Sequence, residues 1–168
     1  RFPPLQTAEI EAILATHGMD DPKRASAIAR LSRGSAARAL ALAEGDEPPL
    51  DELLKALKSG KSADFAAAQE IAQSLFSNRG PAVDNFELIA RLLEEILCYK
   101  LLKADFAAYS KETATAMAEL AQGLTIDGIL RCLDAAVKAA GAIEAMANPR
   151  LQAEQWWMTA ADALRGEN

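Results

Sequence analysis

Few side chains in this sequence of 168 residues could carry covalent or metal chemistry, because it contains one histidine and two cysteines. A Ser-His-Asp or Cys-His catalytic set would depend on His17, which precedes Gly18 at the predicted end of a helix and is typical of a solvated helix end. Cys98 and Cys132 lie within apolar helical patterns and are predicted to be buried, reduced thiols, with a disulfide between them left open. We expect no catalytic residue and no metal site.

One short run, Gly60-Lys61-Ser62, matches the end of a phosphate-binding loop. The complete motif requires another glycine five residues before Gly60, where this chain has Lys55, and it requires a strand before the loop. The preceding residues read as helix, and so we interpret the run as a turn between helices and expect no cofactor. Glu94 and Glu95 are adjacent on a predicted helix and diverge by about 100°, which makes them a poor acid/base pair.

Basic residues gather in the first part of the chain, where they could touch the phosphate groups of a nucleic acid. No aromatic residues alternate with them as platforms for stacked bases. The formal net charge of −6 also argues against a nucleic-acid surface over most of the molecule. We expect these residues to be solvated or to face another subunit. The cluster consists of Lys23, Arg24, Arg30, Arg33 and Arg38.

The last predicted helix carries apolar residues on two faces. Trp157 belongs to one apolar stripe, and Trp156 lies toward its edge. Leu151 and Met158, one heptad apart, fall on the opposite face beside Gln155. A peripheral helix needs only one apolar stripe to pack on its own bundle, so the second stripe is either sandwiched within the bundle or offered to a partner. Leu151, Gln155, Trp156 and Met158 are therefore the candidate partner-binding residues.

Helices must position these residues, because the composition strongly favours them. The sequence contains 37 alanines and 22 leucines against 9 isoleucines and 2 valines, a bias toward helix formers that predicts an all-α fold. Thr7, Asp21 and Ser35 are the predicted N-caps of the first three helices, and Gly45 ends the third. Six further helices are predicted over residues 50–58, 63–77, 84–105, 111–122, 125–146 and 149–165.

Residues 45–49, Gly-Asp-Glu-Pro-Pro, have the composition of a linker between domains. Through Glu44 the chain has 6 basic and 5 acidic residues, or +1, whereas the remainder has 12 and 19, or −7. We expect a three-helix domain over residues 1–45 and a larger helical domain over residues 48–168. No apolar run approaches the ~18 residues of a membrane span and no signal peptide is visible, so we expect a cytoplasmic protein without a membrane partner.

Two of the long helices are expected to pack differently. Apolar residues, with Leu101 and Leu102 among them, cover well over half the circumference of helix 84–105, which is typical of the centre of a bundle. Helix 125–146 has one apolar stripe, opposite a ladder of acid-before-base pairs four residues apart. The stripe consists of Ile126, Ile129, Leu133, Val137, Ala140 and Ile143, and the ladder of Asp127, Arg131, Asp134 and Lys138.

The order of these elements resembles the AAA+ clamp-loader subunits of bacterial DNA polymerase III. The resemblance to their small helical lid domain rests on the run Phe2-Pro3-Pro4-Leu5 before a short helix and on residues 28–43, IARLSRGSAARALALA. The remainder, with residues 147–151 (ANPRL) before its last helix, looks like their C-terminal collar domain in order and character. The resemblance implies a small three-helix lid bundle followed by a larger helical collar bundle.

The resemblance also implies that this chain lacks nucleotide chemistry. In ATP-hydrolysing relatives, the Gly-Ser-x-Arg segment supplies a sensor arginine that reaches toward the nucleotide phosphates. The matching position here is Ala37, and Arg38 lies about 100° farther around the helix, so the cation that would stabilise the phosphates is missing. This departure is similar to the delta-prime branch of the family, which is generally regarded as non-hydrolysing. Since the chain begins at Arg1 without a methionine, we expect a piece of a longer protein whose nucleotide-binding-type domain precedes it.

The function implied is a non-catalytic assembly module of the delta-prime type. Its collar would associate with the collars of other clamp-loader subunits, so that the assembled loader places the sliding clamp on primed DNA during replication. Contact with DNA would be indirect, through the assembled loader. Two alternatives stay open: a fragment of an ATP-hydrolysing gamma/tau-type subunit, which Ala37 disfavours, and an unrelated cytosolic helical adaptor.

Overall fold

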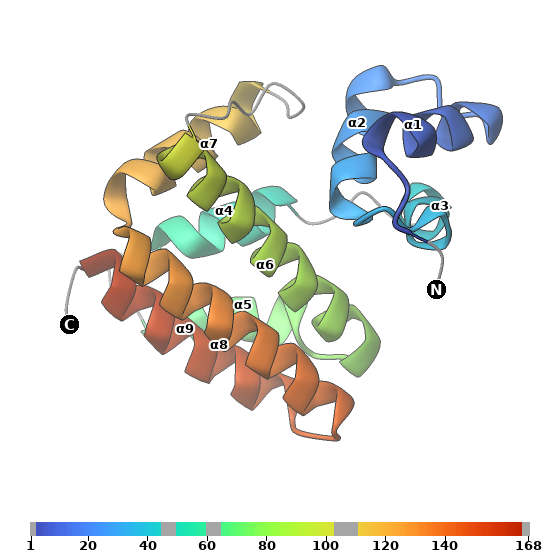
Figure 1. The fold of residues 1–168 in the computed structure, drawn as a ribbon. Helices are drawn as coiled ribbons and strands as arrows, with labels where there is room; N and C mark the ends of the chain where they lie inside the picture. The colour runs from blue at the N-terminus through green and yellow to red at the C-terminus, as the bar shows by residue number, and fades with distance from the viewer. Residues whose placement is uncertain (1–2, 45–49, 60–64, 103–110, 166–168) are drawn as a thin grey trace. The chain divides into compact units, whose positions relative to one another are not determined.

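The computed structural model describes residues 3–44, 50–59, 65–102 and 111–165, and over these ranges the chain forms helices and no β-strand (Figure 1). The predicted all-α fold is confirmed. None of the described helices is both long and apolar enough to cross a lipid bilayer. The helices are α1 (Thr7–Thr16), α2 (Pro22–Leu31), α3 (Ala36–Glu44), α4 (Leu50–Ser59), α5 (Phe65–Leu75), α6 (Arg79–Leu102), α7 (Lys111–Gly123), α8 (Ile126–Glu144) and α9 (Pro149–Arg165).

Side chains cap the first three helices, two of them as predicted. The Asp21 carboxylate accepts hydrogen bonds from two amides in the first turn of α2, and the Ser35 hydroxyl accepts one from an amide in the first turn of α3. The prediction for α1 was wrong by one residue, because Thr7 is already helical and Gln6 occupies the cap position. The backbone N–H of Gln6 donates to the Glu9 carboxylate at 2.7 Å, which is half of a capping box and does not need a hydroxyl at the cap.

Helix α6 begins at Arg79, whereas the sequence pattern predicted a start near residue 84. The difference arises at Pro81, because a proline usually separates helices. Pro81 lies in the first turn of α6, where backbone N–H groups have no partner within the helix, so a proline costs no hydrogen bond there. The Ala82 N–H already donates to the Asn78 carbonyl oxygen at 3.0 Å. The predicted end of this helix near residue 105 lies outside the described residues.

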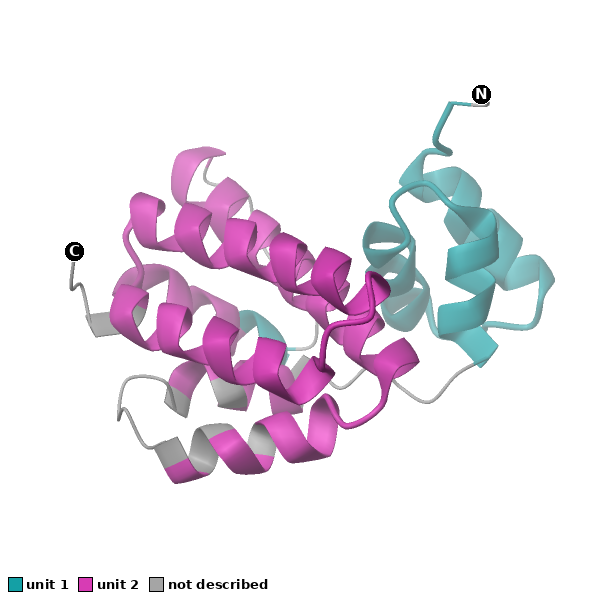
Figure 2. Cartoon of the chain, turned by 90° about the horizontal axis from the view of Figure 1, so that it is seen from below, with its two compact units in different colours: residues 1–49, 106–114 teal, residues 50–105, 115–168 magenta. Residues whose placement is uncertain are grey.

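The chain divides into two compact units, the first comprising residues 1–49 and 106–114 and the second residues 50–105 and 115–168 (Figure 2). In the first unit, α1, α2 and α3 pack around a small apolar core. Leu40 and Ala43 of α3 pack half-buried against that core. The predicted linker, residues 45–49, lies outside the described residues. The buried core residues are Ile10, Leu14, Ala25, Ile28, Ala29 and Ala39.

The turn between α2 and α3 requires glycine at position 34. Gly34 has a φ of +77°, and a Cβ there would lie 2.5 Å from the Cβ of Pro4 and 2.8 Å from the backbone nitrogen of Leu5. The backbone N–H of Leu5 also donates to the Gly34 carbonyl oxygen at 2.9 Å. The Gly-Ser pair is therefore explained structurally: Gly34 leaves room for the backbone at Pro4 and Leu5, and Ser35 caps α3.

In the second unit, α6 is the central helix, as its broad apolar surface predicted. It packs along α8, which in turn packs along α9, and α9 also contacts α5. Phe86 of α6 packs on Phe76 with the rings tilted by 45° and their centroids 4.7 Å apart, and it makes an edge-to-face contact with Trp156 at 6.1 Å. The buried residues of α6 are Ala82, Asn85, Phe86, Leu88, Ile89, Ala90, Leu92, Leu93 and Ile96.

The C-terminal end of α6 departs from the prediction, because Leu101 and Leu102 are exposed. Helices α6 and α8 run antiparallel, with Arg79 at the start of α6 bonded to Ile143 near the end of α8. Since α6 has 24 residues and α8 has 19, the last turn of α6 extends beyond the start of α8. Amphipathic patterning alone does not report where a neighbouring helix ends.

Polar side chains of α6 secure the C-terminal ends of three neighbouring helices. Arg79 donates to the carbonyl oxygens of Ile143 and Met146 at the end of α8. The Asn85 amide donates to the last carbonyl oxygen of α5, that of Leu75, at 2.7 Å, and the Lys100 ammonium donates to a carbonyl oxygen in the last turn of α7 at 2.6 Å. The last four carbonyl oxygens of a helix lack the usual donor from the next turn, and that of Ile143 also accepts a hydrogen bond from the Met146 N–H at 3.0 Å. The α6 side chains therefore add hydrogen bonds at the ends of its neighbours to the apolar packing along them.

The buried face of α8 was predicted only in part. Ile129 and Ile143 of the predicted stripe are buried, whereas Ile126 and Val137 are exposed and small residues occupy much of the buried face. A Cβ on Gly128 would lie 3.3 Å from the Cβ of Ala163, so α8 and α9 approach each other closely there. The polar ladder is confirmed by two ion pairs, Asp127–Arg131 at 3.6 Å and Asp134–Lys138 at 2.7 Å. The buried residues of α8 are Gly128, Ile129, Cys132, Ala136, Ala139 and Ile143.

Candidate partner-binding surface

Aromatic contacts fix the rotation of α9 about its own axis. The Trp156 indole N–H donates to the carbonyl oxygen of Cys132 in α8 at 3.0 Å. Its ring meets Phe86 edge-on and lies 6.2 Å from the ring of Trp157, which is also buried. With both indoles committed to the interior, the opposite side of α9 must face outward.

Trp156 was a candidate for partner binding, and the structure does not support it in that role. The residue is only 4% exposed, and its one polar atom is already satisfied by α8. The physical reason lies in α8, whose buried face consists largely of small residues and offers the Cys132 carbonyl oxygen as an acceptor for the indole N–H. A large residue at the edge of an apolar stripe can be buried when the neighbouring helix presents small side chains.

Leu151 and Met158 form an exposed apolar strip on the outer side of α9, with Gln155 between them. Leu151 is 51% exposed and Met158 is 60% exposed. Gln155 is exposed as well, and its side-chain oxygen accepts a hydrogen bond from Gln152 at 3.3 Å. At the start of the helix, the Asn148 side chain accepts hydrogen bonds from the first-turn amides, which holds Leu151 in helical conformation. We refer to Leu151, Gln155 and Met158 as the α9 face.

The chemistry available on the α9 face is recognition of an apolar surface with one polar contact. Leucine and methionine side chains offer apolar area, and the methionine thioether adapts to irregular shapes. The Gln155 amide offers both a donor and an acceptor. None of these groups is an acid, a base or a nucleophile suited to covalent chemistry.

The two cysteines occupy different environments, and both are free thiols. Cys132 is buried as predicted, and desolvation raises the pKa of its thiol from 9.0 to about 11 despite the opposing effect of the Arg131 charge. Cys98 is exposed, contrary to the prediction. It lies on the side of α6 turned away from the buried residues Leu92 and Ile96, so an apolar neighbourhood in sequence did not mean burial.

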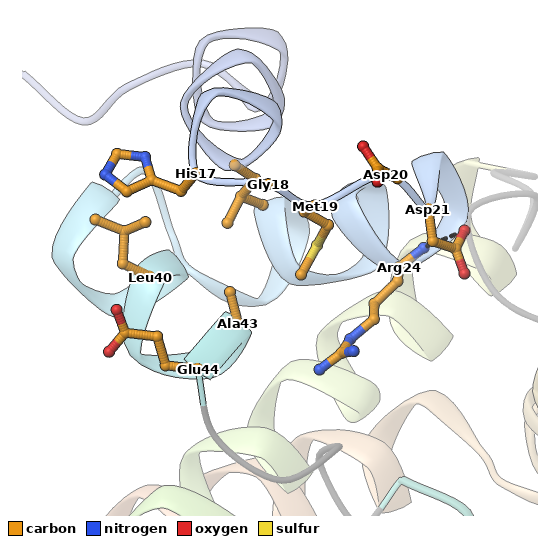
Figure 3. Close-up of a pocket in the computed structure, with 10 residues that line it drawn as sticks. His17, Gly18, Met19, Asp20, Asp21, Arg24, Leu40, Ala43 and Glu44 are labelled. Atoms are coloured by element: carbon orange, nitrogen blue, oxygen red, sulfur yellow. Dashed lines mark hydrogen bonds between the residues drawn. The ribbon is translucent and has the colours of Figure 1, made fainter.

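His17 behaves as a helix-end residue, as predicted. It is exposed at the C-cap of α1, and its Nδ1–H donates to the Ile13 carbonyl oxygen at 2.9 Å. It lines an open groove of about 410 Å³ in the first unit, where Met19, Leu40 and Ala43 contribute apolar surface (Figure 3). Asp20 and Arg24 line the end of the groove away from His17, so charges of both signs border it. The residues that line the groove do not form a catalytic set.

The remaining chemistry-bearing candidates are dispersed. Ala37 is exposed on α3, one residue before the half-buried Arg38. Glu94 is ion-paired with Arg91. The run Gly60-Lys61-Ser62 lies outside the described residues. Within the described ranges, no group of three or more histidine, cysteine or carboxylate side chains could hold a metal ion.

The sequence pattern missed a second exposed apolar strip, on α8. Leu130 is exposed together with Ile126 and Val137, and Leu133 is half-buried beside them. Their alternating spacing of four, three and four residues is the feature from which this strip could have been found. Instead, Ile126, Leu133 and Val137 were assigned to the buried stripe, and Leu130 was not considered.

Comparisons with known proteins do not identify a family for this fold and its two exposed strips. Scans against protein-family models, curated proteins and solved structures found no match to the chain.

Proposed function

We propose that this chain is a non-catalytic assembly module of the clamp-loader type, similar to the lid and collar domains of the delta-prime subunit of bacterial DNA polymerase III. In that role the second unit joins the collars of other loader subunits, and DNA is contacted only through the assembled loader. The observation that carries the proposal is the α9 face, an exposed apolar surface on a helix whose opposite side is fixed by two buried tryptophans.

Two features of the first unit support the same proposal. The run that resembles the lid forms α2, the glycine-dependent turn at Gly34 and α3, in the order that the resemblance implies. Ala37 is exposed near the start of α3, so the position matching the sensor arginine offers no cation to a phosphate. The second feature favours a member of the ring that does not hydrolyse ATP.

The test is assembly of the purified 168-residue chain with purified bacterial gamma-type and delta-type clamp-loader subunits, measured by light scattering after size exclusion. We expect a complex that the double variant Leu151→Gln/Met158→Gln weakens at least tenfold. Each of these side chains has about half of its surface left to bury, and complete burial of such a side chain contributes roughly 1.5–3 kcal/mol. The melting temperature of the isolated chain should hardly change, since both side chains are exposed.

A matched control is Leu130→Gln, which removes a comparably exposed leucine from α8 and should leave this complex intact. Failure to bind any clamp-loader subunit would contradict the proposed function. Binding that survives the α9 variant but is lost in the α8 variant would contradict the assignment of the interface to α9. An unfolded double variant would contradict the exposure on which the assignment depends.

The proposal also requires that this chain bind no nucleotide. A calorimetric titration with ATP and Mg²⁺ should give only heat of dilution. Micromolar ATP binding that is abolished by Lys61→Ala would overturn the interpretation of Gly60-Lys61-Ser62 as a turn, and with it the non-catalytic role.

A further inference from the structure

The four methionines of the chain differ in how far solvent reaches them. Met117 of α7 is fully buried, and Met19 packs half-buried against the core of the first unit. Met146, in the turn between α8 and α9, is 75% exposed, and Met158 of α9 is 60% exposed. A small oxidant in solution can therefore reach Met146 and Met158 in the folded chain, while Met117 is shielded.

Oxidation by a peroxide changes a methionine side chain from apolar to polar. Hydrogen peroxide transfers one oxygen atom to the sulfur: the O–O bond of the peroxide breaks, an S=O bond forms and water leaves. The sulfur is oxidised by two electrons, and the peroxide is reduced by two. A reductase that supplies two thiols removes the oxygen from the sulfoxide as water, while the thiols form a disulfide. The modification is therefore reversible.

Met158 brings this chemistry to the α9 face. Leu151 and Met158 are the two apolar side chains of that face, and the hydrogen bond from the Trp156 indole to α8 keeps both turned outward. Met146 does not belong to the α9 face. Its backbone has a φ of +75°, and its carbonyl oxygen accepts a hydrogen bond from Arg79 at 3.4 Å. The two exposed methionines thus offer the same chemistry at two places, one of which is the candidate binding surface.

We propose that Met158 is a modification site at which a peroxide reversibly weakens partner binding through the α9 face. The inference rests on the proposed function, in which that face is buried against another loader subunit. In the free chain, water hydrogen-bonds to the sulfoxide oxygen. An apolar partner surface offers that oxygen no donor, and burial of a polar group without a hydrogen bond is unfavourable. The oxidised chain should therefore bind its partner more weakly than the reduced chain.

Oxidation of Met158 should leave the fold intact. Two buried indoles, those of Trp156 and Trp157, hold α9 from the opposite side, and Met158 already lies mostly in solvent. The melting temperature of the isolated chain should therefore hardly change. Because the exposed Cys98 thiol also reacts with peroxide, every chain compared below carries Cys98→Ser. Burial raises the pKa of the Cys132 thiol to about 11, so that thiol is shielded and stays protonated at neutral pH.

Peptide mass spectrometry after brief treatment with hydrogen peroxide tests the modification itself. We expect a sulfoxide at Met146 and at Met158 and an unmodified Met117. A Met158 that stays unmodified while Met146 is oxidised would overturn the inference. Equal oxidation of Met117 and Met158 would do the same, because the reaction would then follow unfolding rather than exposure.

Assembly with untreated gamma-type and delta-type clamp-loader subunits tests the consequence, with each chain compared before and after peroxide. Treatment should weaken the complex about fivefold or more in the Cys98→Ser chain and equally in the matched control that adds Met146→Leu. A chain that adds Met158→Leu instead should keep whatever affinity it has. Methionine sulfoxide reductase with a dithiol should restore the first two complexes. Weakening that persists with Met158→Leu, or that disappears with Met146→Leu, would overturn the inference.

The same chains separate failure of this inference from failure of the proposed function. A complex that forms and does not respond to peroxide contradicts the inference alone. If the untreated chain joins no loader subunit, the proposed function is contradicted, and retention on a phenyl column still tests the change in polarity. The chain with Met146→Leu should elute earlier after oxidation and return to its original position after reduction, and unchanged retention would overturn the inference.

Discussion

The thiol of Cys132 shows how burial alters a residue's chemistry. It lies on the buried face of α8, where desolvation raises its pKa from 9.0 to about 11 although the Arg131 charge opposes the rise. Because the folded state keeps the proton to higher pH than the unfolded state, the associated stability is fully present below pH 9 and is lost as the pH rises toward 11. A thiolate is not a plausible nucleophile here at neutral pH.

We expect the free energy of unfolding to fall by about 2–3 kcal/mol between pH 9 and pH 11 through this one group. Other groups titrate in the same range, so the measurement is the difference between the native chain and Cys132→Ala in chemical denaturation across that interval. As the pH rises, the native chain should lose stability relative to Cys132→Ala. Any advantage in its free energy of unfolding should therefore shrink or change sign. Parallel curves for the two chains would show that the thiol titrates alike in the folded and unfolded states.

At the scale of residues, the sequence predicts helix caps better than it predicts the burial of side chains. The caps at Asp21 and Ser35 were predictable, because short polar side chains bond to nearby amides whatever the surrounding fold. The burial of Trp156 was not predictable, because it depends on the residues that the neighbouring helix presents. The exposure of Cys98 was missed because its apolar neighbours in sequence do not show which side of α6 it occupies. A helical wheel gives the angle of each side chain about the helix axis, but it does not show which residues of a neighbouring helix face that side chain.

Among the elements, α6 stabilises its neighbours through their ends, and Asn85 tests this arrangement. Its amide is buried and donates to the Leu75 carbonyl oxygen at 2.7 Å. Asn85→Asp should lower the free energy of unfolding by at least about 2 kcal/mol at pH 7, because a buried carboxylate then faces a carbonyl oxygen.

The loss should be largely recovered in acid, since a protonated carboxyl can donate the missing hydrogen bond. Urea denaturation at pH 7 and at pH 4 measures both effects against the native chain. Asp84→Ala, at the exposed neighbouring position, should change stability by no more than about 0.5 kcal/mol. If Asn85→Asp lowers the free energy of unfolding equally at pH 7 and at pH 4, the hydrogen bond to the Leu75 carbonyl oxygen contributes little to stability.

The order and type of the helices were predictable from the sequence, whereas the facing sides of α8 were not. Alanine-rich segments between Gly and Pro breaks define helices locally. The contact between α8 and α9 depends on Gly128 and Ala163, whose small size permits close approach. A ranking by hydrophobicity undervalues such residues, and it therefore assigned Ile126 and Val137 to the core when the fold leaves them at the surface.

At the scale of the whole molecule, the two units have separate cores, and we expect them to lose structure separately. The buried core cluster described for the first unit has six residues, three of them alanines, so the stability of this unit should be a few kcal/mol. Leu14→Ala removes a wholly buried side chain and should cost about 2–5 kcal/mol within that unit. Hydrogen exchange should then show lost protection in α1–α3 and unchanged protection in α6.

The converse variant, Leu92→Ala, should lower protection in α6, α8 and α9 while leaving α1–α3 as they were. Equal loss of protection everywhere in either variant would mean that the two units unfold as one cooperative body.

The antiparallel pairing of α6 with α8 also has a consequence for folding during synthesis on the ribosome. Arg79 of α6 meets its partner Ile143 only after a further 64 residues have been added. The three helices of the first unit, by contrast, find one another within their own stretch of about 40 residues. At about 5–20 residues per second, α6 spends several seconds outside the exit tunnel with most of its apolar circumference bare. During that interval a nascent-chain chaperone has its best opportunity to bind, and we expect crosslinks to α6 that disappear once α8 has emerged.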